Sequence, residues 1–567
     1  MKRFFIKLVI TGLAFGGGHH AIAQDLADIN LKQPVRFSGN LNVQLERYTA
    51  TGIQNRRQPF SWLIAGNPSV NILGVELPFS FLFSNFENRY YQPFNQFGVS
   101  PHYKWATLHL GYRNIQFNPF TLGGYRMLGA GIELNPRGFR FGFMYGRLNR
   151  STALDSAQNA NPLAYREQLS YTRMAYAVKV GVGNDKSYFD VSYLKGWDQR
   201  GSLAAKYRDS LPAQENAVPG LSWQATVFKK LVWKTDVGFS VYTLDVTSPS
   251  VADSSAPEIV KNGAAVLKLK TSTQYLIAGE TRLGWRGRIL GGDVIYRRVD
   301  PDYKSMGAYF FQTDIEQYSV APYLRLDSGK ILVNGSAGIQ KDNLYGLKSA
   351  TAQRFIGNVN VNWNPSQRFG VNANYSNFGI TQNPTITAPG VELFKQVSTN
   401  VTLTPYVNLT NEVTSKNIQL VASYLLLNSP SATILASPNQ HTFVGSLIYA
   451  HTWLSKGYSG NISLNYNNTV IAAQGAIGSY GLGLGTSIPL FGNRTSVNVN
   501  GGYNSNFYNS AANGYTVTAD AGCAYPFAKQ HSVQLVVSYL NNSSKDQTVV
   551  QSFSEYIFRV VYGFTLK

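Results

Sequence analysis

The 567-residue chain is poor in charge, in cysteine and in methionine. Charged residues make up 14% of it, against about 25% in an average soluble domain. Its one cysteine, Cys523, excludes an internal disulfide and a cysteine-rich metal site. Only 5 methionines accompany 52 glycines, 35 tyrosines and 32 phenylalanines. This balance favours extended strands and argues against a helical protein.

From residue 24 onward the chain also lacks the apolar run of about 18 residues that a membrane helix needs. At its start, basic residues accompany an apolar stretch, 4–15, which leads to the small-residue sequence Ala-Ile-Ala at 21–23. This layout predicts a cleaved signal peptide over 1–23, with an amphipathic first helix as the alternative. The mature chain is then either soluble outside the inner membrane or crosses a membrane as a closed barrel.

Polar and apolar residues alternate along most of the mature chain. The pattern is clear at 35–46, at 397–403, at 496–500 and in the final strand, 556–564. Residues 358–376 form a predicted hairpin of two such strands around an Asn-Pro-Ser-Gln-Arg turn. A period of two gives each strand one wet face and one apolar face. A soluble β-sandwich would show the same alternation, so the lengths of the connections between strands have to distinguish it from a membrane barrel.

Short and long connections between strands alternate along the chain. Tight turns are predicted near Leu73-Gly74, Pro101-His102, Asn135-Pro136-Arg137, Asn184-Asp185, Lys229-Lys230, Arg286-Gly287, Asp327-Ser328, Pro365-Ser366, Asn408 to Glu412, Ser455-Lys456, Gly492-Asn493 and Ala528-Lys529. Long loops are predicted near 49–57, 149–170, 198–219, 247–273, 300–309, 342–353, 379–394 and 428–439, with shorter ones elsewhere. Short periplasmic turns opposite longer extracellular loops are typical of outer-membrane barrels.

These connections predict an all-β fold, a transmembrane antiparallel up-and-down β-barrel of about 26 strands, with 22 to 26 acceptable. We expect a short periplasmic segment at 24–34 and a single barrel domain over 35–567, with no room for a plug ahead of the first strand. The predicted location is the outer membrane of a Gram-negative bacterium.

Several segments also resemble a known group of proteins. They are Gly111-Tyr112-Arg113, the run from Tyr296 to Tyr303, Met306 to Phe311, and Tyr375 to Phe378. In these segments the chain is similar to the large, porin-like outer-membrane β-barrel proteins of Bacteroidota. The resemblance implies the fold and the location; it implies no activity and no catalytic residue.

Catalytic chemistry has little support in the sequence. Five histidines remain after signal cleavage, namely His102, His109, His441, His451 and His531. No HExxH motif, Cys/His cluster or GxSxG elbow is present. A Ser/His/acid set assembled in space remains an alternative. We predict no catalytic, metal or cofactor site, no cofactor, and no enzyme.

The densest charge falls on two central strands. Glu280, Arg282 and Arg286 share one face of the first, and Asp293 and Arg297 share one face of the second. These five are the candidate lumen charges, forming either a salt-bridged wall or a constriction that selects solutes. We favour the wall, because a wide barrel needs a polar lining in either case. Farther along, the polar faces carry mainly Asn, Ser, Thr and Gln.

The net charge of +20 has two interpretations of equal weight. Many basic residues fall at the predicted periplasmic turns, where they either meet anionic headgroups of outer-membrane lipid or are simply solvated. Neither interpretation involves nucleic acid.

Two functions follow from an otherwise empty wide pore. The first is a pore or transport channel with a polar lumen, narrowed by the loops at 149–170, 198–219 and 247–273 folding inward. The alternative is a non-conducting scaffold or export-complex partner, which holds a periplasmic or surface protein in its lumen or on its loops.

Overall fold

The computed structural model describes residues 35–85, 95–152, 169–208, 210–251, 269–309, 312–384, 394–428, 439–492, 494–545 and 551–566. The predicted signal peptide and the segment at 24–34 lie outside these ranges, as do parts of four predicted long loops: 153–168, 252–268, 385–393 and 429–438.

Strands make up almost all of the described chain. The first half contains β1 (Val35–Thr51), β2 (Phe60–Gly66), β3 (Ser69–Ile72), β4 (Val75–Ser84), β5 (Gln96–Val99), β6 (His102–Tyr103), β7 (Ala106–Gln116), β8 (Gly123–Leu134), β9 (Phe139–Asn149), β10 (Thr172–Gly183), β11 (Tyr188–Gln199), β12 (Glu215–Val227), β13 (Leu231–Thr243) and β14 (Thr273–Trp285). The second half contains β15 (Leu290–Val299), β16 (Ile315–Leu326), β17 (Ile331–Lys341), β18 (Ala350–Trp363), β19 (Phe369–Pro384), β20 (Phe394–Thr410), β21 (Thr414–Asn428), β22 (Gln440–Trp453), β23 (Tyr458–Ile471), β24 (Gly475–Leu490), β25 (Thr495–Tyr508), β26 (Ala511–Ala528), β27 (His531–Ser544) and β28 (Phe553–Leu566).

The described helical elements are short: η3 (Arg200–Ser202), α2 (Ala205–Arg208) and η5 (Asp327–Gly329). Within the described ranges, no helix has the length and apolar character needed to span a membrane.

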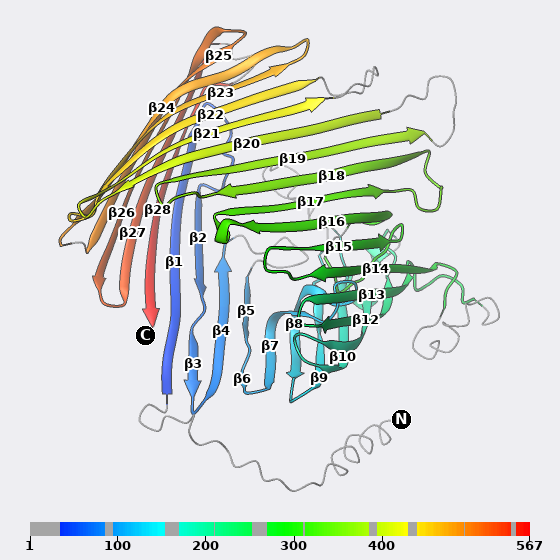
Figure 1. The fold of residues 1–567 in the computed structure, drawn as a ribbon. Coiled ribbons are helices and arrows are strands. Elements are labelled where there is room, and N and C mark those ends of the chain that lie inside the picture. Colours follow the sequence, from blue (N-terminus) through cyan, green and yellow to red (C-terminus); the bar gives the residue numbers. More distant parts are fainter. Residues whose placement is uncertain are drawn as a thin grey trace.

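The strands close into a barrel (Figure 1). Each pairs antiparallel with its neighbours, and β1 pairs antiparallel with β28 from Gly39 opposite Leu566 to Thr51 opposite Ser554. The strands β2 and β3 together fill the place between β1 and β4. Likewise β5 and β6 together fill the place between β4 and β7. The 28 labelled strands therefore make 28 − 2 = 26 barrel positions, which confirms the predicted fold.

Twelve short turns lie at the end of the barrel where β1 begins and β28 ends, which we call the turn end. They confirm the predicted turns with small shifts. The second turn falls at Lys104-Trp105, because His102 and Tyr103 still pair with Thr107 and Ala106. The predicted loop 198–219 is shorter than expected, since β12 already begins at Glu215. The opposite end is the loop end, and with an even strand number the turn end is the periplasmic one.

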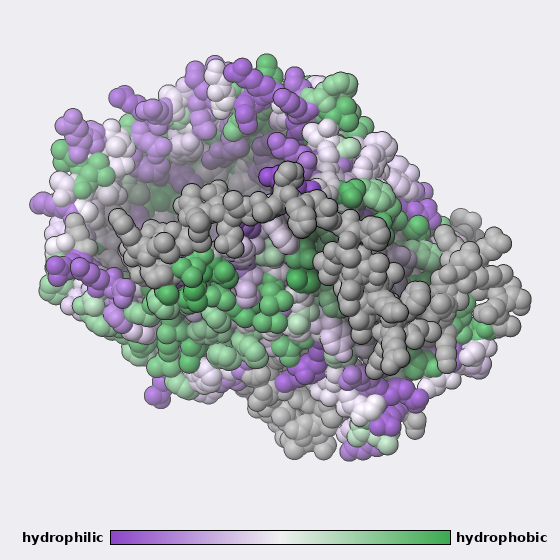
Figure 2. Space-filling model, turned by 90° about the horizontal axis from the view of Figure 1, so that it is seen from below, coloured by the Kyte–Doolittle hydropathy of each residue, from purple (hydrophilic) through white to green (hydrophobic). Residues whose placement is uncertain are grey.

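The alternation of the sequence places apolar side chains outside and polar ones inside. On β11, Phe189 and Val191 are 44% and 49% exposed, whereas the intervening Asp190 and Ser192 are 3% and 2% exposed. Cross-strand partners share a face, so the registers carry this inside–outside assignment from strand to strand. Figure 2, a view from below, shows hydrophobic residues along one side of the barrel and hydrophilic residues toward its margins. A closed barrel with this outer surface is the form in which strands cross a bilayer, and the protein lies in the outer membrane.

Candidate functional site

Two connections of the loop end lie against the inner wall of the barrel. The first inner segment, 117–122, joins β7 to β8, and the second inner segment, 300–309, follows β15. Their buried side chains form the largest apolar clusters of the described chain together with residues of β7 to β16. The core of this barrel is therefore inside the wall, on one side of the lumen.

Asn118 anchors the first inner segment and is 1% exposed. Its side-chain amide donates to the carbonyl of Leu221 at 3.0 Å and to the Ser222 hydroxyl at 2.9 Å. Its Oδ1 accepts from the backbone N–H of Phe120 at 2.8 Å, which fixes the turn of the segment. One buried side chain thus holds this segment on β12 by hydrogen bonds that an apolar residue cannot make.

Backbone groups hold the second inner segment. The N–H of Met306 donates to Oδ1 of Asn216 at 3.0 Å, and the Ser240 hydroxyl donates to the carbonyl of Lys304 at 2.6 Å. Asn216 and Ser240 are fully buried on β12 and β13. Because these inward-facing polar residues bond to the segment, it is docked on the wall at defined points.

The two inner segments also bond to each other. The Ser305 hydroxyl donates to the carbonyl of Thr121 at 2.6 Å, and the N–H of Gly123 donates to the carbonyl of Gly307 at 2.9 Å. The Tyr303 hydroxyl donates to the carbonyl of Phe120, and burial raises the pKa of this phenol. Tyr303 therefore stays a hydrogen-bond donor at neutral pH, and the segments form one unit.

Glycines in the wall make room for this unit. A Cβ at Gly196 would lie 2.8 Å from the sulfur of Met306, and one at Gly238 would lie 2.5 Å from the Tyr303 hydroxyl. A Cβ at Gly220 would lie 2.3 Å from the methyl of Thr121. Three neighbouring strands thus have no side chain where the inner segments approach most closely.

A cavity of about 390 Å³ lies beside the second inner segment. Arg173 and Tyr242 line it from the wall, and Asp302, Lys304 and Tyr309 line it from the segment. Arg173 is held by Asp198 through a 2.7 Å hydrogen bond. The Lys304 ammonium lies 5.7 Å from the centre of the Tyr242 ring. The cavity thus presents charge of both signs and aromatic faces.

Four of the five candidate lumen charges lie on the inner face of β14 and β15, and the fifth, Arg286, lies in the turn between them, because β14 ends at Trp285. Glu280 contacts Arg282 at 3.3 Å and Arg297 at 3.7 Å. Asp293 contacts Arg286 at 2.7 Å and Arg282 at 4.0 Å. All five therefore form one ion-pair network. The favoured interpretation, that these charges form a salt-bridged wall and not a constriction that selects solutes, stays a prediction.

The network touches the inner segments directly. The Arg297 guanidinium lies 5.9 Å from the centre of the Phe120 ring, a cation–π contact with the first inner segment. Charge also continues on the neighbouring inner wall. Asp236, the cross-strand partner of Glu280, accepts a 2.6 Å hydrogen bond from the Ser222 hydroxyl. The same hydroxyl accepts a hydrogen bond from the side-chain amide of Asn118. The anchoring of the first segment and the charged wall are thus one connected system.

The wall from β17 to β27 differs, because hydrogen-bonded neutral residues dominate it. Representative pairs are Asn358 with Ser336, Asn374 with Asn360, Ser446 with Asn465, and Asn506 with Thr516, at 2.5 to 3.0 Å. The lumen therefore has a charged side, where the inner segments dock, and a neutral side.

The inward folding of the loops 149–170, 198–219 and 247–273 stays a prediction, and two other segments dock on the inner wall. The regions 149–170 and 247–273 lie largely outside the described residues. In the third, 198–219, Leu203 and Ala213 pack with Tyr171. The predicted loop at 300–309 contacts the inner wall, but neither it nor 117–122 was expected there. The residues that permit docking are a buried asparagine, Asn118, and three glycines on the facing strands β11 to β13. Their role can be recognised only when it is known which segments lie against them.

The described histidines show no metal-site arrangement. His109 contacts Glu133 at 3.1 Å on the inner wall, and His451 accompanies Tyr449 on the outer face. No group of three or more His, Cys, Asp or Glu side chains placed to hold a metal ion occurs in the part of the chain that the structure covers.

Comparisons with known proteins give structural likeness only. No family model and no curated protein matches the chain. Similar solved structures include the P pilus usher (PapC) translocation pore, with 12% identity, a TM-score of 0.36, and 94% of this chain and 99% of that chain covered. The copper transporter OprC has 7% identity, a TM-score of 0.38, and 94% and 80% coverage. The FrpB iron transporter from Neisseria meningitidis has 10% identity, a TM-score of 0.37, and 93% and 81% coverage. The fold assignment rests on the strand pairing described above, and these alignments carry no statement about a ligand.

Proposed function

We propose that the protein is an outer-membrane pore or transport channel for small polar solutes, with a lumen narrowed by the two inner segments. The observation that carries the proposal is their docking on the inner wall through Asn118, Asn216 and Ser240. Barrels of 16 to 18 strands already leave an aqueous channel, and those of 22 strands are plugged. A barrel of 26 strands needs such a restriction to preserve the permeability barrier.

The lining supports a polar solute over an apolar one. A solute passing the inner segments meets the ion pairs of β14 and β15 on the same side and amide side chains on the other. The cavity beside Lys304 offers a resting place where charge and aromatic faces are combined. Rings of charged side chains are a common means of solute selection in pores. No group here is assigned a catalytic role.

Single-channel recording tests this proposal. The purified protein is reconstituted in planar bilayers and compared with a variant in which 302–308 is replaced by a short Gly/Ser linker. We expect a small conductance for the wild type and a clearly larger one for the variant, because the second inner segment no longer fills its side of the lumen.

Absence of conductance in both proteins would count against the channel. Retention of a stoichiometric companion protein on native purification would then favour the alternative function, a scaffold or export-complex partner. Heat-modifiable migration of both proteins in gels serves as the folding control.

A further inference from the structure

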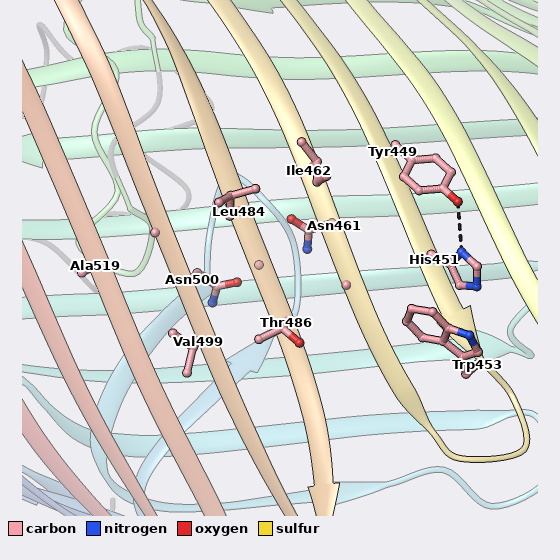
Figure 3. Close-up of a pocket in the computed structure, with 13 residues that line it drawn as sticks. Tyr449, His451, Trp453, Asn461, Ile462, Leu484, Thr486, Val499, Asn500 and Ala519 are labelled. Atoms are coloured by element: carbon pink, nitrogen blue, oxygen red, sulfur yellow. Dashed lines mark hydrogen bonds between the residues drawn. The ribbon is translucent and has the colours of Figure 1, made fainter.

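A groove with a cavity of about 630 Å³ lies on the outer face of the barrel, away from the lumen (Figure 3). It runs across β22 to β26 near the turn end. One row of cross-strand partners on the outer face crosses it, namely Tyr449, Ile462, Leu484, Gly501 and Ala519. This row belongs to the lipid-facing surface, so what fills the groove comes from the membrane.

One side of the groove is a row of three aromatic rings on β22. Figure 3 shows Tyr449, His451 and Trp453 in succession on this strand. The Tyr449 hydroxyl and Nδ1 of His451 are 3.0 Å apart, and the His451 and Trp453 rings stack with centroids 4.1 Å apart. The Tyr449 and His451 rings meet edge to face, at 77°, and these contacts keep the three rings together as an aromatic wall. Trp453 is the last residue of β22, so the wall reaches the turn end.

Small residues form the floor of the groove. A Cβ at Gly460 would have only the carbonyl of Gly485 within 4 Å, at 3.6 Å, and one at Gly501 would have only the carbonyl of Thr518, at 3.8 Å. Ala519 pairs with Gly501, and beyond it Tyr539 restores a large outward side chain. The floor is therefore open at Gly460, opposite His451, and again at Gly501 and Ala519, between Leu484 and Tyr539. Its volume lies within the roughly 300–1,000 Å³ of small-molecule sites.

The three turns that border the groove are basic, whereas the adjoining turn after β20 carries Glu412 and accepts a hydrogen bond from Leu454 through the carbonyl of Val413. The turns after β22, β24 and β26 contain Lys456, Arg494 and Lys529, respectively, and no acidic residue. None of these three basic residues enters an ion pair within the described chain. Basic groups at the membrane surface attract anionic headgroups. The apolar groove thus matches the acyl chain of a lipid, and the cationic turns match its anionic headgroup.

We propose that this groove is a binding site for an anionic glycerophospholipid of the periplasmic leaflet. One acyl chain lies on Gly460, Gly501 and Ala519 against the aromatic wall, and the phosphate faces Lys456 and Arg494. The site is independent of the proposed channel function, because it uses only the outer face.

Native mass spectrometry tests the site with 1-palmitoyl-2-oleoyl phosphatidylglycerol and the matching phosphatidylcholine as probes. Two variants fill the groove, Ala519→Phe and Gly460→Leu. The matched control is Ala337→Phe, which is outward-facing and exposed on β17, far around the barrel. We expect the wild type and the control to retain one phosphatidylglycerol, and both filled variants to lose it.

The charge of the turns is tested in the same way. Lys456→Gln and Arg494→Gln should each lower the affinity for phosphatidylglycerol about fivefold, the effect of one basic residue near an anionic surface, and leave phosphatidylcholine unaffected. Equal retention by the filled variants, loss in the Ala337→Phe control as well, or equal binding of both lipids to the wild type would each overturn the proposal. So would a wild-type dimer that Ala519→Phe dissociates, which would identify a second copy as the occupant.

Discussion

The hydroxyl of Tyr303 donates a 2.8 Å hydrogen bond to the backbone carbonyl of Phe120, a residue 183 positions earlier in the chain. The two rings also meet edge to face, with centroids 6.2 Å apart and planes at 87°. This contact joins the two inner segments above the glycine of β13 that leaves room for them, Gly238. The proposed restriction of the lumen depends on such contacts, and they can be tested one at a time.

Removal of the Tyr303 hydroxyl should loosen the inner segments without unfolding the barrel. Tyr303→Phe leaves the buried carbonyl of Phe120 without this donor, at a cost of about 1–3 kcal/mol. Because each 1.4 kcal/mol is about tenfold in an equilibrium, we expect faster amide exchange at Gly123, whose N–H bonds to the second segment. Hydrogen exchange measures this, with Tyr309→Phe as the control, since Tyr309 is 49% exposed. Unchanged exchange in Tyr303→Phe would show that the hydrogen bond does not hold the segments.

A methyl group at Gly307 should drive the two inner segments apart. The Cβ of Gly307→Ala would lie 2.1 Å from Leu194 and 2.8 Å from the carbonyl of Thr121, so something must move. We expect a larger single-channel conductance than in the wild type. Gly279→Ala is the matched control, because its Cβ would meet its nearest neighbour at an ordinary 3.5 Å. Equal conductance of both variants would separate the segments from the conduction path.

Neutralising one carboxylate of the charged wall should change ion selectivity. Glu280→Gln leaves Arg282 and Arg297 without the anion that they share, so we expect a shift toward anions. The reversal potential in a salt gradient measures the shift. Glu316→Gln removes the same charge from the outer face, where Glu316 pairs with Lys341, and should leave selectivity unchanged. A shift of equal size in both variants would contradict a selective role for the β14–β15 network.

Acid should release the connection between β17 and β18. Burial of Asp314 opposes its ionisation, but hydrogen bonds from Lys348 and from the backbone N–H of Leu344 and Asn343 outweigh it and hold the pKa of this carboxyl below its ordinary value. The stabilisation is therefore complete above the ordinary pKa of about 3.9 and is lost as pH falls through the lower folded value. The bond to Asp314 raises the pKa of Lys348, so this contact is complete below about pH 10 and weakens above it.

Amide exchange at Asn343 and Leu344, corrected for the intrinsic rate, measures this pH dependence. We expect protection from pH 5 to pH 9 in the wild type. Asp314→Asn should lose protection over the same range, because it removes the charge that Lys348 contacts and weakens the acceptor. Protection that is independent of both pH and this substitution would contradict the assignment.

Alternation and turn chemistry determined the fold. A period of two assigns each residue to a face without any knowledge of its partners, so the outward apolar and inward polar surfaces were readable directly. Turn residues such as those at Asn184-Asp185 and Pro365-Ser366 indicated where the chain reverses, and hence the number of barrel strands, 26. The four charges of β14 and β15, Glu280, Arg282, Asp293 and Arg297, could be placed on one wall for the same reason.

Only the tertiary structure decided what lies inside the barrel. The docking of 117–122 and 300–309 depends on contacts between positions 183 residues apart, as for Tyr303 and Phe120, and on buried partners on a third region of the wall such as Asn216. No local pattern encodes these contacts, since a loop that extends outward and one that folds inward have the same composition. The sequence by itself therefore determined the wall and its two faces, and the tertiary structure decided which segments pack against it.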